Sequence, residues 1–517
     1  MSSEPKKVGR RTFLNYAIAV VATGVIVGAA TYLATPKGGV TTVTVPGGTT
    51  TVTAPGATVT TTKTVTGTTT PTTTTIKDWL KEVSKPYKGV TVKAIAESTP
   101  PSGWIQETLV PEFEELTGIK VEIERLGWDD VLKKEMLDGE QKQGTYDLYY
   151  IDEIEVMALF FDKNFIIDIL DFASAHSGIY YPDFDLPDLI PVKYFTYNGK
   201  VAGIPFELFF RLYAYRKDLF NDPAEKSNFK AKYGIELKPP QTWAEYEKIA
   251  EFFTRPDKNL YGHIEMPSSM SLPSDVDNFL LTYGITASGI SVGRKASVEN
   301  GGELNSPAAL LWFKRYIDWM KFAPPGVQTF TWDNLASEFL AGHVTQGLIF
   351  GDQLATVIDP SVSQVAGKVD VSLPPIEPKY MRFYCPSVFG DMGMFALSSQ
   401  SKNKEAAFLF LQWIACKENA AREMEALGTL CTRASLLFSP LAEQVDAKYK
   451  WNYFKVLKQC YMQGLNSGPF EAMPELLTFR DILWKELTRA IAGEIKPEEA
   501  LNNAARGIDE KSKELGW

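Results

Sequence analysis

Residues 90–151 decide the fold and read VTVKAIAESTPPSGWIQETLVPEFEELTGIKVEIERLGWDDVLKKEMLDGEQKQGTYDLYYI. Three short segments in this stretch predict strands: Val90–Ala96 and Asp147–Ile151 resemble buried strands, and Ile119–Glu124 alternates apolar and charged residues as a half-buried strand does. Between them, Ile105–Thr117 and Trp128–Leu137 have the spacing of amphipathic helices, and Gly118 suits the end of the first helix. Strands that alternate with helices indicate βαβ units and a mainly parallel sheet, so the predicted fold class is α/β.

Helix and strand signals keep alternating toward the C-terminus, and no internal repeat is evident. Six further amphipathic helices are predicted: Thr242–Phe253, Ala308–Lys321, Asn334–Ala341, Lys404–Leu427, Met473–Gly493 and Glu498–Leu515. Strand-like stretches lie between them: Leu212–Tyr215, Gln346–Phe350 and Met392–Leu397. A chain of 517 residues is long enough for roughly two to four domains.

Charge and composition narrow the class of protein. The formal net charge is −10, and Glu4 is the only acidic residue among the first 75, so the rest of the chain is strongly acidic. An acidic body without a basic stripe argues against a nucleic-acid partner. The three histidines have no metal-ligand spacing and no CxxC pair occurs, so neither a metal nor a cofactor is predicted. The cysteines can form one or two disulfides or remain separate buried thiols: Cys385, Cys416, Cys431 and Cys460.

The N-terminal residues have the pattern of an export and anchoring segment. A basic cytoplasmic start, residues 1–11, precedes an apolar run, residues 12–34, of about the length that spans a bilayer as a helix. Arg10-Arg11 resembles a twin-arginine export signal, and basic residues at this end place the rest of the chain outside the cell. We favour a retained transmembrane helix over a removed signal peptide, and both remain open.

A Thr/Pro/Gly-rich linker, residues 35–76, follows the apolar run and contains 20 threonines between residues 41 and 75. Such a segment has too little apolar surface to offset the entropy of ordering it, so we expect a disordered stalk. Stalks of this composition are often O-glycosylated. The linker would let a globular body move over the membrane surface while it stays attached.

Several short motifs share their order and spacing with one known family. They are Phe113–Val121, Tyr146–Asp152, Gly203-Ile204-Pro205, Leu212–Phe220, Pro240–Glu245, Phe339–Gly342, Gly347–Gly351 and Ser401–Ile414. From Val90 to the C-terminus, about 420 residues, the chain resembles the extracellular solute-binding proteins of ABC transporters, of the maltose-binding-protein class. It departs from that family at Cys431-Thr432-Arg433, where a proline more often precedes the arginine.

The resemblance implies a periplasmic-binding-protein-like fold, with two α/β lobes that close over a ligand in the cleft between them. It assigns residues 77–206 plus 375–430 to lobe 1 and residues 207–374 plus 431–517 to lobe 2, with crossings near 205–210, 372–378 and 430–434. It further implies a monomer without catalytic activity that delivers its ligand to the membrane permease of an ABC importer. The expected ligand is a small polar solute, with a sugar or oligosaccharide as the first choice.

Candidate ligand-binding residues lie in loops after predicted strands, where acids stand beside aromatic rings. A sugar needs strong acceptors for its hydroxyl groups and a flat apolar surface for its C–H face. These requirements select Glu97, Ser98, Trp104, Asp152, Glu153, Glu207, Phe209, Trp332, Asp352 and Asp391, and the resemblance adds Arg480, because Met473–Arg480 faces the cleft in relatives. Asp152 and Asp352 are explained equally well as helix N-caps, and Trp104 and Trp332 by core packing.

Two other classes of protein are alternatives. An exported hydrolase, a glycosidase or esterase, would suit Gly289–Gly293, which matches G-x-S-x-G, but a helical stretch stands where a nucleophile elbow needs a strand. A surface-adhesion protein would suit the linker, although such proteins are usually all-β repeats. Within the binding class, the ligand could be a peptide, a phosphodiester or iron, the last because of Tyr149-Tyr150, while the many acids disfavour an anion.

Overall fold

The computed structural model describes residues 44–45, 48–49, 74–190, 195–268, 271–285, 287–381, 390–462 and 473–517. The predicted cytoplasmic start and transmembrane segment lie outside these ranges, as does most of the predicted linker. Within the linker, β1 (Thr44–Val45) and β2 (Gly48–Thr49) pair antiparallel. Among the helices of the described ranges, none is both long enough and apolar enough to cross a membrane.

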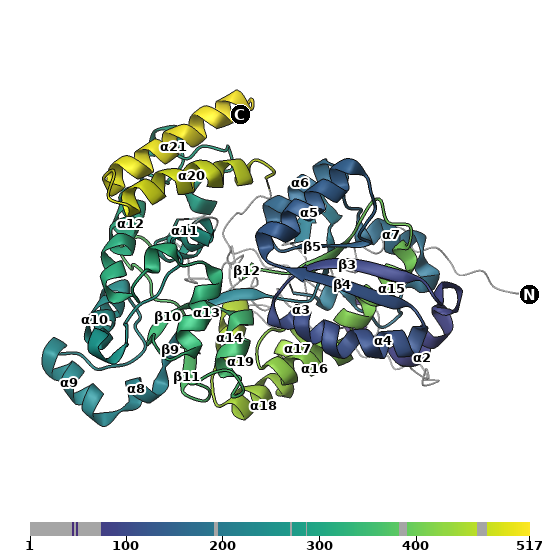
Figure 1. The fold of residues 1–517 in the computed structure, drawn as a ribbon, viewed down its shortest axis with the longest axis horizontal. Helices are drawn as coiled ribbons and strands as arrows, with labels where there is room; N and C mark the ends of the chain where they lie inside the picture. Colours follow the sequence, from purple (N-terminus) through teal and green to yellow (C-terminus); the bar gives the residue numbers. More distant parts are fainter. Residues whose placement is uncertain are drawn as a thin grey trace, which may run out of the picture.

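Two α/β lobes make up the body, and Figure 1 shows them side by side. The first lobe is built on a five-stranded sheet with the order β4-β3-β5-β13-β8. Its strands are β3 (Thr91–Glu97), β4 (Lys120–Leu126), β5 (Leu148–Ile151), β8 (Gly203–Pro205) and β13 (Met394–Leu397). Strand β3 runs parallel to β4 and β5, as the sequence predicted, while β13 is antiparallel to both of its neighbours.

Helices cover this sheet, and every residue of the central strand β5 is buried. They are α2 (Ile76–Val83), α3 (Pro100–Trp104), α4 (Val110–Thr117), α5 (Trp128–Gln141), α6 (Ile154–Asp162), α7 (Ile169–Ala175), α15 (Lys404–Ala415) and α16 (Lys417–Leu427). A π-helical turn, Ile105–Leu109, joins α3 to α4, so the predicted helix begins earlier than expected, at Pro100. It ends where the sequence placed its end, because Gly118 adopts a φ of 71° that favours glycine.

The second lobe is built around one long strand, β9 (Phe209–Arg216). Its partners are β10 (Gln346–Phe350), β11 (Val369–Ser372) and β12 (Gly390–Asp391), and all three pair with it antiparallel. A parallel sheet was expected, and that expectation is wrong for this lobe. Strand β9 leads away from the first lobe, whereas its three partners run back toward it.

Nine helices in the described part of the chain surround this second sheet. They are α8 (Lys217–Asn221), α9 (Pro223–Tyr233), α10 (Trp243–Phe253), α11 (Ser271–Thr282), α12 (Pro307–Trp319), α13 (Trp332–Leu340), α14 (Gly351–Ile358), α20 (Leu476–Ile491) and α21 (Pro497–Glu514). Trp243 and Trp312 are buried in the aromatic core of this lobe, and Trp413 in that of the first lobe. All three therefore serve packing, which agrees with their predicted positions on amphipathic helices.

Two short segments connect the sheets directly. Residues 206–208 join β8 to β9, and residues 392–393 join β12 to β13. Before the second crossing the chain still contacts the second lobe, since Ile376 forms a bridge with Thr242 and Glu377 accepts a hydrogen bond of 2.6 Å from Arg315. The return to the first lobe therefore follows β12, later than the boundary at residue 375 expected from the sequence.

The remaining elements lie between and beside the lobes. Helix α18 (Pro440–Tyr449) contacts α16 and α17 (Ala434–Leu437), whereas α19 (Tyr453–Met462) contacts β11. Strands β6 (Thr196–Tyr197) and β7 (Lys200–Val201) form a separate hairpin. Cys416 and Cys431 are buried thiols without a disulfide, Cys460 is buried, and Cys385 lies outside the described residues. The alternative of separate buried thiols therefore holds for Cys416 and Cys431.

Candidate functional site

A cleft of about 660 Å³ opens between the two lobes. Its first wall belongs to the first lobe and consists of Glu97, Ser98, Leu126, Gly127, Trp128, Asp129, Asp130, Lys133, Asp152 and Glu153. Its second wall belongs to the second lobe and consists of Phe209, Met266, Ser271, Ser274, Thr331, Trp332, Asp333, Phe350 and Arg480. The volume falls within the usual range for a small-molecule site.

The first wall follows from the parallel strands of its lobe. Strands β3, β4 and β5 end at the same edge of the sheet, so the residues that follow them lie together. Trp128 opens α5 just after β4, and Asp152 follows β5. The indole Nε1 of Trp128 donates a hydrogen bond of 2.9 Å to Oδ1 of Asp152, which fixes the position of the ring beside the carboxylate.

The second wall is formed where the N-terminal ends of α11, α13 and α14 meet. Trp332 is the first residue of α13, and its backbone N–H donates to Oγ of Ser271 at 3.2 Å. Gln353 in α14 donates from Nε2 to the carbonyl oxygen of Trp332 at 2.6 Å. These two bonds hold the half-buried Trp332 in the second wall of the cleft.

Arg480 connects the walls. It lies on α20 of the second lobe, and its side chain is only 4 % exposed. Nη1 donates to Oε2 of Glu153, in the first lobe, and Nη2 donates to Oδ2 of Asp277, on α11, each at 2.8 Å. Asp277 also accepts a hydrogen bond from Ser288. A charged triad therefore links the two lobes at one side of the cleft.

Burial and the charges of neighbouring acids raise the pKa of carboxyl groups in the cleft. Burial, with a smaller contribution from the neighbouring charge of Glu153, raises the pKa of Asp152 to about 7. Burial also raises the pKa of Glu97 well above its usual range, with the charges of Asp152, Asp352 and Asp333 adding to the effect. A charge that enters the cleft would change the pKa of these carboxyl groups, since a neighbouring positive charge favours their ionised form.

Seven of the eleven residues selected from the sequence line the cleft: Glu97, Ser98, Asp152, Glu153, Phe209, Trp332 and Arg480. Trp104, at the end of α3, packs against the hydrophobic core and is not among the lining residues. Glu207 and Asp352 are fully buried and do not line the cleft. The backbone of Asp391 pairs with Phe209, whereas its side chain is outside what the structure describes.

Sequence reasoning missed several residues of both walls, chiefly Trp128, Asp129, Asp130 and Asp333. The signal for the first three was present, because they follow β4 as Ser98 follows β3. The rule that selected residues after strands was applied to β3 and β5 but not to β4. Asp333 and the serines of α11 follow no strand, so this rule could not find them.

Two alternative sites lack the expected geometry. Ser291, in the G-x-S-x-G match, follows a 3-10 turn (Ala287–Gly289) rather than a strand, so it does not sit on a nucleophile elbow. Tyr149 and Tyr150 are buried, and their hydroxyls donate to Asp138 at 2.6 Å and to Glu97 at 3.4 Å. Among the described residues, no group of three or more His, Cys, Asp and Glu side chains could hold a metal ion.

Comparison with known proteins defines the class to which this fold and cleft belong. The model of the bacterial extracellular solute-binding protein family matches residues 96–421, more than half of the chain. The chain therefore belongs to that family. It is the extracytoplasmic solute-binding component of an ABC transporter and not an enzyme, which sets the hydrolase and adhesion alternatives aside.

The individual relatives found by sequence and by structure share less than 25 % of their residues with this chain. A probable amino-acid ABC transporter periplasmic-binding protein of Sinorhizobium fredii is 20 % identical over 455 residues, covering 85 % of this chain and 94 % of its own. A solute-binding protein of Agrobacterium radiobacter K84, solved with ribitol, has a TM-score of 0.68 at 23 % identity over 82 % of this chain and all of its own.

Two further solved structures extend the same likeness. A solute-binding protein of Agrobacterium vitis S4, solved with D-mannitol, has a TM-score of 0.68 at 21 % identity over 83 % of this chain and 99 % of its own. Maltose-bound MalE3 of T. maritima has a TM-score of 0.66 at 19 % identity over 81 % and 99 %. At such identities these structures show the shared fold, which is the periplasmic-binding-protein-like fold expected from the sequence.

Proposed function

We propose that the cleft binds a sugar, polyol or oligosaccharide, and that the lobes close over it by hinge rotation. The observation that carries this proposal is the pair of tryptophans, Trp128 on the first lobe and Trp332 on the second, each beside carboxylates. Aromatic faces match the C–H surface of a sugar ring, and carboxylates are strong acceptors for its hydroxyls. A site divided between two lobes is completed only when they approach each other.

The ligand contacts that we propose come from both walls. From the first lobe they are Glu97, Ser98, Trp128, Asp152 and Glu153, and from the second lobe Phe209, Trp332 and Asp333. We assign Glu207 and Asp352 an indirect role behind the floor of the cleft, keep Asp391 as a candidate, and give Arg480 the role of an interlobe link. Trp104 packs against the core and does not line the cleft, so we propose no ligand contact for it.

The solved relatives with ribitol, D-mannitol and maltose support a polyhydroxylated ligand. The relative named as an amino-acid transporter component suggests an amino acid as the second candidate. An amino acid would need a cation for its α-carboxylate. Both basic side chains of the described cleft already have acidic partners: Arg480 pairs with Glu153 and Asp277, and Lys133 with Asp130 at 3.4 Å. A sugar is therefore the better fit.

The N-terminal segment completes the proposal. Residues 12–34 would anchor the protein as a single transmembrane helix with residues 1–11 in the cytoplasm, and residues 35–76 would tether the body to it. The body would act as a monomer and present its closed form to a membrane permease. We retain two lobes, with residues 77–206 in lobe 1 and the return from lobe 2 to lobe 1 placed after Asp391.

A thermal-shift screen of the full-length chain tests the proposed ligand class. Sugars, polyols and oligosaccharides are compared with amino acids, peptides, a phosphodiester and ferric iron. A ligand at a hundredfold over its dissociation constant stabilises the folded state by about 2.7 kcal/mol, which is visible as a raised melting temperature. A shift with sugars or polyols supports the proposal, whereas a shift confined to the other compounds overturns the ligand class.

A further inference from the structure

The basic side chains of the cleft are already balanced by acids of the protein. Arg480 donates one side of its guanidinium to Glu153 and the other to Asp277, and its side chain is almost fully buried. Lys133 lies 3.4 Å from Asp130 on the exposed rim. Neither basic group therefore balances the remaining carboxylates of the cleft.

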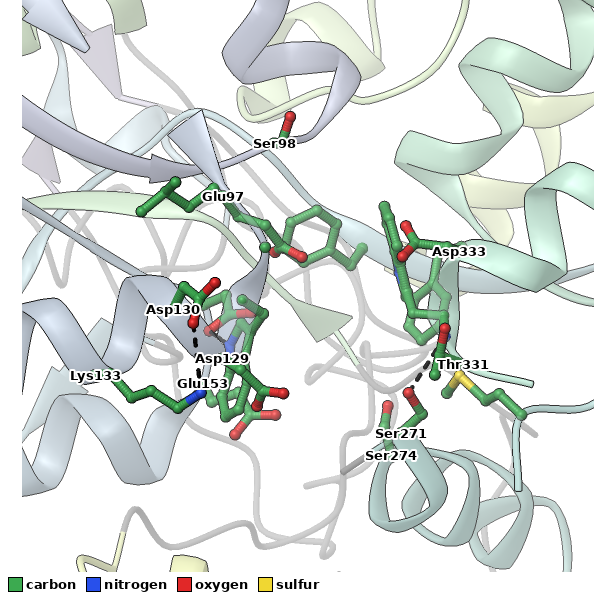
Figure 2. A pocket seen from close by; sticks show the side chains of 18 of the residues that line it. Glu97, Ser98, Asp129, Asp130, Lys133, Glu153, Ser271, Ser274, Thr331 and Asp333 are labelled. Atoms are coloured by element: carbon green, nitrogen blue, oxygen red, sulfur yellow. Dashed lines mark hydrogen bonds and ion pairs between the residues drawn. The ribbon is translucent and has the colours of Figure 1, made fainter. Parts of the chain in front are cut away.

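Four of these carboxylates have no ion pair with a described residue. Glu97 and Asp152 accept hydrogen bonds from the neutral groups of Tyr150 and Trp128. Asp129 on the first lobe and Asp333 on the second are exposed. Figure 2 shows Glu97 and Asp129 on one side of the cleft and Asp333 on the other. The exposed Asp129 and Asp333 thus place like charges on the same space from the two lobes.

Two more carboxylates lie near the floor of the cleft. Glu207 comes two residues before Phe209, Asp352 two residues after Phe350, and both phenylalanines line the cleft. Both acids are 0 % exposed, and their carboxylate oxygens have no hydrogen-bond partner of standard geometry among the described residues. No described Lys or Arg forms an ion pair with either. Buried acids without a counter-ion are unfavourable, and when ionised they add to the negative potential of the cleft.

The tryptophans of the two walls, like the acids, favour a positively charged ligand. The face of an indole ring attracts a cation more strongly than any other side-chain ring does. A neutral sugar can use the carboxylates as acceptors, whereas a cation also reduces the repulsion between those that are ionised. We infer that the cleft selects an amino sugar that carries an ammonium group over the neutral sugar of the same shape. This inference rests on the proposed function, because it specifies the charge of the sugar.

Binding of matched sugars to the full-length chain tests the inference. The probes are D-glucosamine, D-glucose and N-acetyl-D-glucosamine, together with deacetylated chito-oligosaccharides and cello-oligosaccharides of the same lengths. Calorimetric titration is carried out at a pH below the pKa of the sugar ammonium group, at low and at high salt. We expect ammonium sugars to bind at least about tenfold more tightly than their neutral counterparts, which corresponds to about 1.4 kcal/mol, and this preference to shrink in high salt.

Variants connect the preference to the cleft. Asp129→Asn and Asp333→Asn each remove an exposed carboxylate, so neither threatens folding, and each should lower the preference for the ammonium sugar about two- to fivefold. Glu510→Gln is the matched control, because it removes the same charge from an exposed position on α21 outside the cleft. It should leave the preference unchanged.

The outcomes separate the two claims. If neutral sugars bind as tightly as ammonium sugars, or if Glu510→Gln lowers the preference as much as Asp333→Asn does, the inference is overturned and the proposed function stands. If no sugar of either kind binds while another class of compound does, the proposed function fails and the inference fails with it.

Discussion

Replacing Arg480 with methionine should strongly destabilise the folded protein. Methionine keeps much of the side-chain volume but leaves the carboxylates of Glu153 and Asp277 without their shared cation. Asp277 is 0 % exposed and Glu153 is 16 % exposed, so water cannot replace the guanidinium at Asp277. Removing one partner of a buried ion pair costs about 3–5 kcal/mol, and we expect a loss near the lower end because Glu153 is partly solvated.

A second substitution separates this cause from lost packing. Burial raises the pKa of Asp277, and Arg480 is the largest influence that lowers it, so Asp277 without Arg480 is an unbalanced buried acid. The double variant Arg480→Met/Asp277→Asn removes that acid and should recover at least about half of the lost stability. Lys485→Met, on the exposed face of the same helix, is the control and should change stability by less than about 0.5 kcal/mol.

Urea denaturation of the variants measures these differences as shifts of the midpoint at constant slope. The explanation would be refuted if Arg480→Met lost less than about 1 kcal/mol, or if the double variant were no more stable than the single one. In the first case the triad would contribute no more than an exposed ion pair. In the second case the loss would come from packing of the side chain.

Three further predictions each concern one residue: Trp332 in ligand binding, and Asp352 and Gly203 in stability. Trp332→Ala should weaken sugar binding about tenfold in a calorimetric titration, while Trp104→Ala, outside the cleft, should not weaken it; equal effects would contradict the proposed site. Burial raises the pKa of Asp352 from 3.8 to about 7, so the folded protein holds a proton that the unfolded chain has lost, and stability should fall as the pH rises through that window. Asp352→Asn should remove this fall and add at most about 4 kcal/mol at pH values above the window, measured by urea denaturation, and an unchanged slope would count against it. Gly203→Ala would push a Cβ into the backbone of Phe395 and should lower the free energy of unfolding by about 1–3 kcal/mol in urea denaturation, whereas Gly127→Ala, with open space around it, should not.

The first lobe could be predicted from the sequence because its signals are local. Its three parallel strands, the helices between them and the end of α4 at Gly118 follow from periodicity and capping. The second lobe could not, because its sheet depends on pairs between distant segments. Strand β9 meets partners that begin at Gln346, Val369 and Gly390, and no local pattern states their direction or the point where the chain returns.

The residues of the candidate site likewise fall into those that the sequence predicts and those that it does not. Residues at or directly after the ends of strands in the first lobe, such as Glu97 and Asp152, could be found by one rule. Asp333 lies at a helix N-terminus and follows no strand, so the same rule could not find it, and the full burial of Asp352 is visible only in the folded chain. The link from Arg480 to Glu153 joins residues 327 positions apart and is visible only in the folded chain.

Small-angle X-ray scattering of the full-length chain, with and without a saturating sugar identified by the thermal-shift screen, tests the central claim most directly. The claim is that the ligand binds between two lobes that close over it. We predict that the radius of gyration falls when the sugar is bound, and that Trp332→Ala needs about tenfold more sugar to reach the same fall. A sugar that raises the melting temperature but leaves the scattering of the unaltered protein unchanged would contradict binding by lobe closure.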